Sequence, residues 1–275
     1  MEISSNSTIN QNLYLNNNQT LNRIATGIEL NQASNDSSSL AIANNLLAQS
    51  SGYSQAIENT NSAIASTQIA SSAINEQSSI LDNIKEKLLQ ASTDTTSQDG
   101  REMILKDIKS QLDQFNQIAS NTNYNGQSLL QNSANDSSSS QAQQYQSGLN
   151  SDNLIESSSV QSNTQGLGLS ALSSQDATSF TSSAAKGFLQ SVDNAINSLN
   201  DIRSEFASVQ NQLESSSRNL MSQEVGTLSA ASVFDTDYAK ESANFSKQNI
   251  MGQIGAFSLA QGNNINQQMV TRLLS

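Results

Sequence analysis

Hydrophobic residues recur at helical spacing along several stretches of the chain, most regularly between residues 185 and 224. Every seventh position from Val192 to Leu220 is apolar, and so is the position four residues before most of these, which is the alternation of a coiled-coil seam. The predicted seam comprises Phe188, Val192, Ala195, Leu199, Ile202, Phe206, Val209, Leu213 and Leu220. A helix over residues 185–224 is roughly 60 Å long at about 1.5 Å per residue, so it must pack against other helices along its length.

Two stretches in the first half, residues 54–91 and 101–119, carry matching apolar stripes and are the expected partners of this helix. The stripe positions are Ile57, Ile64, Ile74, Leu81 and Leu88 in the first stretch and Ile108, Leu112 and Phe115 in the second. The segment between them, "STDTTSQDG", is polar and ends in Gly100, which predicts a turn. Three helices joined in this way form an antiparallel bundle.

The middle of the chain has a different pattern. The pair Asn125-Gly126 is a strong signal for a two-residue hairpin. Farther on, Gly166 and Gly168 stand among short apolar runs, which favour strands over helix. We therefore expect residues 131–184 to form hairpins and loops without a core of their own.

Both ends of the chain carry further amphipathic stripes. The apolar positions are Leu13, Leu21, Ile24 and Ile28 at the N-terminal end, and Tyr238, Phe245, Ile250, Ile254, Phe257, Leu259, Ile265, Met269, Val270, Leu273 and Leu274 at the C-terminal end. An isolated helix of this size is barely stable in water, so both stripes need a partner. The pattern alone leaves open whether they close onto the same molecule or pack against neighbouring molecules.

Together these elements predict a mainly α fold, an elongated antiparallel helical bundle or coiled coil with a small β-hairpin region in the middle. The predicted segments are an N-terminal helix in residues 1–45, long helices in 46–130, the hairpin and loop region in 131–184, a long helix in 185–226 and a C-terminal helix in 227–275. The chain thus runs out along a rod and returns.

Composition supports long helices over a broad globular core. Only 35% of the 275 residues are hydrophobic and 4% aromatic, fewer than a wide core needs, whereas a helix buries only a stripe. Proline, which costs about 3 kcal/mol inside a helix, is absent. The net charge of −12 argues against nucleic acid and anionic membranes as partners. No apolar run is long enough to span a bilayer, so no membrane insertion is expected.

Side chains that carry common catalytic chemistry are missing. The chain has no His and no Cys, which removes the commonest general base, the commonest nitrogen ligand for metals and any thiol nucleophile. No phosphate-binding glycine motif is present, and Asp235 and Asp237 resemble the charged start of a helix. We predict no enzymatic activity, no cofactor and no metal site. The N-terminus lacks the features of a cleaved secretory signal, so export would need another route.

Three motifs, in this order along the chain, resemble segments of bacterial flagellins. "RIATGIELNQASNDSSSLAIANNL" (Arg23–Leu46) resembles the N-terminal signature of a helix, a glycine, a polar turn and a helix of small residues. "NTNYNGQSLL" (Asn121–Leu130) is similar to the segment that turns into the hairpin region. "DTDYAKESANFSKQNIMGQIGAFSLAQGNNINQQMVTRLLS" (Asp235–Ser275) is similar to a flagellin C-terminus, most of all to those of Helicobacter- and Campylobacter-type bacteria.

The resemblance implies a structural subunit that is exported by the flagellar type III apparatus and polymerises into the extracellular flagellar filament for swimming. It implies that the terminal helices form the inner core of the filament and the long helices the next layer, with little or no variable outer domain. The implied partners are other copies of the chain, an export chaperone bound through the C-terminal helix, and the hook–filament junction and filament cap proteins.

Two positions depart from the family pattern. On the helix that faces the animal Toll-like flagellin receptor, here represented by Asn83, Ile84 and Glu86, Glu86 matches the glutamate of the family, but Asn83 stands where many flagellins carry an arginine. Losing a bidentate cationic donor predicts weak or absent receptor activation. Glu29 also stands where flagellins often have arginine, which predicts an altered contact with a neighbouring subunit.

Two other functions remain compatible with the pattern. A hook–filament junction protein shares terminal helices with flagellin but is a minor adaptor that does not propagate a filament. A secreted coiled-coil adhesin or effector would stay soluble without polymerising. The ability of the purified chain to elongate filament seeds separates both from a flagellin.

Overall fold

The computed structural model describes the backbone of residues 2–30, 36–131 and 140–274 and the side chains of residues 14–30, 36–131, 140–257 and 261. Its helices are α1 (Glu2–Thr26), α2 (Ser37–Ala91), α3 (Gln98–Asn121), α4 (Ser170–Ser173), α5 (Ser182–Ala231), the 3₁₀ turn η1 (Ser232–Phe234) and α6 (Tyr238–Leu274). Its strands are β1 (Asn123–Tyr124), β2 (Gln127–Ser128), β3 (Gln144–Gln146) and β4 (Leu154–Glu156). The prediction of a mainly α chain with small antiparallel β elements is confirmed.

The chain divides into two compact units. The terminal unit contains Met1–Ser50 and Val225–Ser275, and the central unit contains Ser51–Glu224. The boundaries fall inside α2 and α5, so each of these helices contributes to both units.

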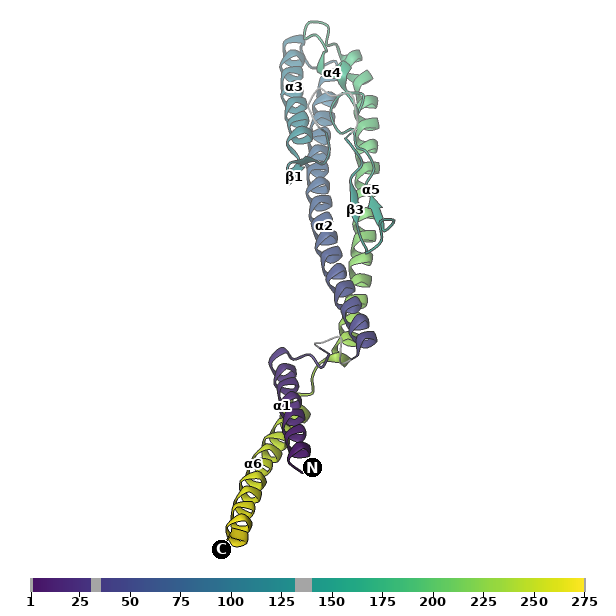
Figure 1. Cartoon of the computed structure of the whole chain (residues 1–275). Coiled ribbons are helices and arrows are strands. Elements are labelled where there is room, and N and C mark those ends of the chain that lie inside the picture. Colours follow the sequence, from purple (N-terminus) through teal and green to yellow (C-terminus); the bar gives the residue numbers. More distant parts are fainter. Residues whose placement is uncertain (1, 31–35, 132–139, 275) are drawn as a thin grey trace. The chain divides into compact units, whose positions relative to one another are not determined.

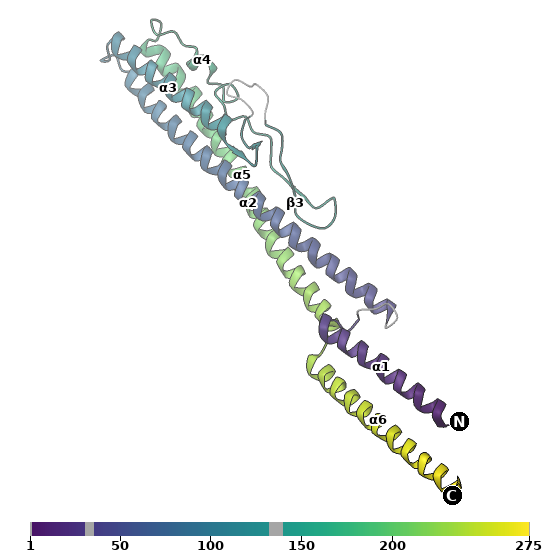
Figure 2. The same ribbon diagram turned by 60° about the vertical axis from the view of Figure 1, so that its left-hand side comes forward.

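The central unit is a bundle in which α2, α3 and α5 lie side by side, with the loops and hairpins of the middle segment against them (Figures 1 and 2). Its core is formed by the apolar stripes of the three helices together with Leu130, Leu169, Leu172 and Phe180 from the middle segment. Phe180 stacks on Phe188 of α5, with 6.5 Å between the ring centroids. The middle segment therefore has no core of its own but completes the core of the helices.

Helix α2 begins much earlier than the stripe at residues 54–91 indicated. It starts after Asp36, whose carboxylate accepts hydrogen bonds from the backbone N–H groups of Ser38 and Ser39 and from the Ser39 hydroxyl. The Ser39 hydroxyl and these N–H groups lower the pKa of Asp36, because they stabilise the charged form. The chain contains no proline, the residue that most strongly breaks a helix, and α2 continues to Ala91.

The predicted turn before α3 is shorter than its sequence suggested. Gly100 was expected to close the turn, but it lies in the first turn of α3, because the Ser97 hydroxyl caps the helix by accepting from the Gly100 N–H at 3.2 Å. Asp99 also favours a helix start at this point, since an acidic side chain complements the positive end of the helix dipole. The 185–224 helix likewise extends at both ends, to residues 182–231.

The middle segment contains two antiparallel hairpins. Asn125 and Gly126, with φ of 50° and 79°, form the turn between β1 and β2, which confirms the hairpin predicted from this pair. The second hairpin pairs β3 with β4. The expected strands around Gly166 and Gly168 are wrong: the described residues 157–169 form no strand, and the chain turns there into the short helix α4.

The β3–β4 hairpin is fixed to the bundle at several points. The Tyr145 and Ser66 hydroxyls lie 3.0 Å apart, and the Ser216 hydroxyl on α5 donates to the backbone carbonyl of Ser147. Beyond β3, Leu149 occupies the space that a side chain at Gly52 of α2 would need, since an added Cβ would lie 2.3 Å from its Cδ2. The absent side chain at Gly52 thus makes room for the hairpin loop.

A buried glutamine connects three parts of the central unit. Gln77 on α2 is fully buried, and its Nε2 donates to the backbone carbonyls of Phe115 on α3 and Ser162 in the middle segment, at 3.1 and 2.9 Å. Its Oε1 has no hydrogen-bond partner among the described residues. The amide nitrogen of Gln77 therefore anchors the loop, whereas its unpaired oxygen lowers the stability of the folded state, because burying a polar atom without a partner costs free energy.

We expect Gln77→Leu to lower the free energy of unfolding of the central unit by about 1–3 kcal/mol, because the Ser162 carbonyl loses its donor inside the core. Urea unfolding followed by circular dichroism measures the change. Gln68→Leu, on the exposed side of the same helix, is the control and should change the stability by less than about 0.5 kcal/mol. Equal stability of the two variants would show that the amide does not anchor the loop.

Candidate functional site

Helices α1 and α6 of the terminal unit lie side by side and antiparallel (Figures 1 and 2). Two contacts establish the direction: Arg23, near the end of α1, meets Glu241 at the start of α6, and Asn17 meets Asn249 farther along. Asp237 begins α6 by accepting from the backbone N–H groups of Ala239 and Lys240, as its acidic start predicted.

The connections that follow α1 and precede α6 are tied together by backbone hydrogen bonds. Gly27 ends α1 with a φ of 72°, the left-handed conformation that favours glycine at this place. The N–H of Glu29 donates to the carbonyl of Phe234, and the N–H of Thr236 donates to the carbonyl of Gly27. The Tyr238 hydroxyl lies 2.8 Å from where a Cβ on Gly27 would be, so a side chain at this position would displace the tyrosine ring. The ends of α1 and α6 are therefore held together.

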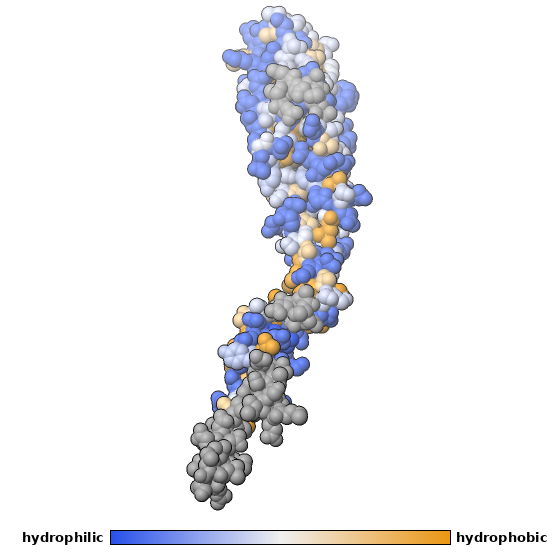
Figure 3. Space-filling view, in the orientation of Figure 1, coloured by the Kyte–Doolittle hydropathy of each residue, from blue (hydrophilic) through white to orange (hydrophobic). Residues whose placement is uncertain are grey.

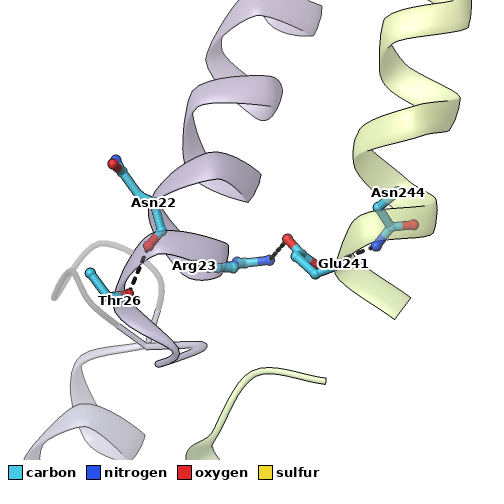
Figure 4. A network of polar contacts seen from close by, with 5 residues as sticks. All are labelled: Asn22, Arg23, Thr26, Glu241 and Asn244. Atoms are coloured by element: carbon cyan, nitrogen blue, oxygen red, sulfur yellow. Dashed lines mark hydrogen bonds and ion pairs between the residues drawn. The ribbon is translucent and has the colours of Figure 1, made fainter. Parts of the chain in front are cut away.

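Polar side chains form a hydrogen-bonded contact between the described parts of α1 and α6. We call it the polar seam and define it as Asn17, Thr20 and Arg23 on α1 with Glu241, Asn244, Gln248 and Asn249 on α6. Figure 4 shows its charged centre, where Arg23 Nη1 lies 3.4 Å from Glu241 Oε1 and Asn244 donates to Glu241 Oε2 at 3.3 Å. The side chain of Glu241 is only 8% exposed and that of Arg23 27%. The carboxylate of this ion pair is therefore largely shielded from water, whereas the guanidinium is partly exposed.

Several polar atoms of the seam are buried without a hydrogen-bond partner among the described residues. They are Asn17 Oδ1, Arg23 Nε and Gln248 Oε1. Each costs free energy to bury, so the seam gives the isolated helix pair less stability than an apolar contact of the same size. The pair is consequently a weak structure on its own.

Large apolar side chains of the same two helices, together with Ile28 just after α1, are exposed to solvent. We call them the outer apolar set, which comprises Tyr14, Leu15, Leu21, Ile28, Tyr238, Ile250, Ile254 and Phe257. Phe257 is 72% exposed, Tyr14 75% and Ile254 60%. By contrast, much of the described surface around α3 is hydrophilic on the face that Figure 3 shows. The described part of the terminal unit thus exposes several large apolar side chains on two helices.

The structure places the residues expected at the polymerisation core as follows. Leu21, Ile28, Tyr238, Ile250, Ile254 and Phe257 are exposed, and Ile24 and Phe245 are half-buried. The side chains of Leu13, Leu259, Ile265, Met269, Val270, Leu273 and Leu274 lie outside the described residues, although the backbone of all seven is helical. Among the described residues, the hydrogen bonds between α1 and α6 join polar side chains, while six of these apolar side chains are exposed.

The residues expected in the bundle seam lie in the central unit. Ile74, Leu81, Leu88, Ile108, Leu112, Phe115, Val192, Leu199, Phe206, Val209, Leu213 and Leu220 are buried, and Ile57, Ile64 and Ile202 are half-buried. On the helix expected to face the receptor, Asn83 and Glu86 are exposed, but Ile84 is fully buried in the core. Placing Ile84 on a receptor-facing surface was therefore wrong.

Reasoning from the sequence missed the polar seam. Its signal was the three-residue spacing of Asn17, Thr20 and Arg23, which places them on one face of α1. Glu241 and Gln248 are similarly seven residues apart on α6. Polar residues at helical spacing usually indicate a solvated face, so only the contact partners reveal their role.

Two family models match the chain. A model of the bacterial flagellin N-terminal helical region matches residues 1–135, and a model of the bacterial flagellin C-terminal helical region matches residues 189–274. Within the described part of the chain, no helix is both long and apolar enough to cross a membrane.

Similar proteins include flagellins from several bacteria. A flagellin of Halalkalibacterium halodurans is 29% identical over 267 residues, covering 96% of this chain and 94% of that protein. A Bacillus subtilis flagellin is 29% identical over 279 residues, covering 93% and 92%. Flagellin B of Helicobacter pylori is 40% identical over 114 residues in the N-terminal region, which is 42% of this chain and 22% of that protein.

Two solved structures share the fold. The crystal structure of Bacillus cereus flagellin has a TM-score of 0.51 at 22% identity and covers 59% of this chain and 88% of its own. A Vibrio parahaemolyticus protein described as flagellar hook-associated has a TM-score of 0.61 at 11% identity and covers 73% and 99%.

Proposed function

Because this chain belongs to the bacterial flagellin family, a family of structural proteins that form the extracellular flagellar filament, we propose that its terminal unit is the surface through which copies polymerise. The observation that carries the proposal is the arrangement of α1 and α6. The hydrogen bonds between their described parts join polar side chains, while large apolar side chains such as Ile254 and Phe257 are exposed. A helix pair of this kind is completed by neighbouring molecules.

The energetics favour assembly over a free helix pair. Burying apolar surface contributes about 25 cal/mol per Å², or about 1.5–3 kcal/mol for each large side chain. The outer apolar set offers eight such side chains. Contacts between identical subunits that do not close into a ring generate helical fibres. Repeated burial of this set from one copy to the next therefore supports a filament.

The proposed role also implies a route of export and further partners. We propose that the chain leaves the cell through the flagellar type III apparatus, accompanied by an export chaperone that binds α6. In the filament, the subunits at the two ends would contact the hook–filament junction proteins and the cap. The weakness of the isolated α1–α6 pair supports this route, since a helix pair that unfolds at low cost suits passage through a narrow channel.

The experiment that tests polymerisation is seeded growth. Purified full-length chain is added to short filament fragments, and their length is followed by electron microscopy. We expect the fragments to lengthen in proportion to the protein added. Fragments that gain only a terminal layer would indicate a junction adaptor, and a chain that stays monomeric would indicate a non-polymerising secreted protein.

We further propose that this chain activates the Toll-like flagellin receptor weakly or not at all. Asn83 and Glu86 are exposed on α2, but Asn83 lacks the cation that the family resemblance leads us to expect there. We expect Asn83→Arg to raise signalling in receptor-expressing reporter cells by about tenfold or more, since a charged hydrogen-bonded contact contributes about 1.5–3 kcal/mol.

Gln90→Arg, another exposed position on α2, is the matched control for this receptor experiment and should leave the signal unchanged. A strong response to the unmodified chain, equal to that of an arginine-bearing flagellin, would contradict the proposal.

A further inference from the structure

Arg23 and Glu241 are placed where helix geometry favours each charge. Arg23 is in the last turn of α1, and Glu241 is in the first turn of α6. A cation at a helix C-terminus and an anion at a helix N-terminus are both stabilised by the helix dipole. Because the helices are antiparallel, these two ends meet, and the ion pair forms there (Figure 4).

A basic residue of α1 can pair with an acidic residue of α6 in only one combination. Arg23 is the only basic residue of α1, and Glu241 is the only acidic residue of α6. Sliding α6 by one turn, about 5.4 Å, would separate the two charges and leave the largely buried Glu241 without a cation. Breaking a buried pair in this way is strongly unfavourable, whereas apolar side chains tolerate a change of neighbour.

A second polar contact has the same register. Asn17 Nδ2 donates to Asn249 Oδ1 at 3.3 Å, six residues before Arg23 on α1 and eight residues after Glu241 on α6. The same slide would break this hydrogen bond as well. The two contacts thus define one alignment of α1 against α6.

We infer that the Arg23–Glu241 ion pair is a register-setting contact, which selects the alignment of α1 and α6 that assembly requires. The inference rests on the proposed polymerisation. Members of the outer apolar set come from both helices, so the alignment of α1 against α6 fixes how these side chains are presented to a neighbouring copy. Buried polar pairs are known to set register at such helix contacts, at some cost in stability.

Charge reversal tests the ion pair. Arg23→Glu and Glu241→Arg, each alone, are expected to raise the critical concentration for seeded growth at least about tenfold, because like charges then meet at a shielded site. The double variant R23E/E241R re-forms the pair and is expected to recover most of the loss. Recovery should be incomplete, since each charge now opposes its helix dipole.

A cysteine pair tests the register directly, because the chain contains no other Cys. Asn17→Cys with Asn249→Cys should form a disulfide in filaments treated with a mild oxidant, since these side chains already touch. Asn17→Cys with Gln253→Cys, one turn out of register, is the matched control and should remain reduced. In Arg23→Leu, Glu241→Leu monomers, which lack the ion pair and are not selected by assembly, both cysteine pairs are expected to cross-link.

The outcomes separate this inference from the proposed function. If the unmodified chain does not elongate seeds, polymerisation itself is wrong. If the unmodified chain elongates seeds and the single charge reversals do so equally well, the ion pair does not set the register. Cross-linking of only the in-register pair in the leucine variant would also overturn the inference, because the register would then be kept without the charges.

Discussion

Replacing Ile250, Ile254 and Phe257 with serine is expected to abolish filament growth from seeds. These side chains are 57%, 60% and 72% exposed on α6 and belong to the outer apolar set. Each large apolar side chain that becomes buried on assembly contributes about 1.5–3 kcal/mol. Losing three of them should raise the critical concentration by about a thousandfold or more, since about 1.4 kcal/mol corresponds to a factor of ten.

The matched control is the double variant Lys247→Ser, Gln253→Ser, which changes two exposed polar positions of the same helix. It should elongate seeds to within about threefold of the unmodified chain, because surface substitutions away from packed contacts change free energies by about 0.5 kcal/mol. In both variants the central unit should unfold at the same urea concentration as in the unmodified chain. Normal growth of the triple variant would show that the exposed face of α6 is not an assembly surface.

Deleting Gly262–Ser275 is also expected to abolish polymerisation while the central unit stays folded. The deletion removes the last part of α6, a helix of 37 residues, together with the apolar positions Ile265, Met269, Val270, Leu273 and Leu274. The residues that form the core of the central unit lie between Ala63 and Leu213, outside the deleted segment. Circular dichroism in urea and seeded growth, measured on the same preparation, test the two halves of this expectation.

Two results would contradict the role assigned to the end of the chain. Filaments grown from the truncated protein would show that these residues are dispensable for assembly. Loss of the central unfolding transition would show that the deletion destabilises the whole molecule instead of removing an assembly surface.

The helices of the central unit could be predicted because the residues that they bury recur at helical spacing in the sequence. The seven-residue spacing from Val192 to Leu220 predicted a long helix, and all five positions of this series are buried in the structure. Asn125-Gly126 predicted its hairpin for an equally local reason, since both residues readily adopt the positive φ that the turn needs. Local conformational preference and burial agree at these places.

Element ends were harder to predict because small interactions decide them. Gly100 resembled a turn residue, but the Ser97 hydroxyl caps α3 ahead of it. Around Gly166 and Gly168, short apolar runs suggested strands, whereas Leu167, Leu169 and Leu172 instead fill the core of the helices from a loop and a single helical turn. Apolar runs of this length do not distinguish these two ways of reaching a core.

The polar seam could not be predicted from either helix alone. Asn17, Thr20 and Arg23 have the composition of a solvated face, and their role depends on residues more than 200 positions away in the chain. The sequence left open whether the apolar stripes pack within one molecule or against neighbouring molecules, and the exposure of Ile250, Ile254 and Phe257 favours neighbouring molecules.

The most direct test measures whether the outer apolar set becomes buried on assembly. Ile254→Cys, the single thiol in the chain, is mixed as a minor component with unmodified protein, and its reaction rate with a maleimide is compared between monomers and filaments. We expect a high rate in monomers, where position 254 is 60% exposed, and a rate at least about tenfold lower in filaments. Equal rates in the two states would contradict burial of this face between subunits.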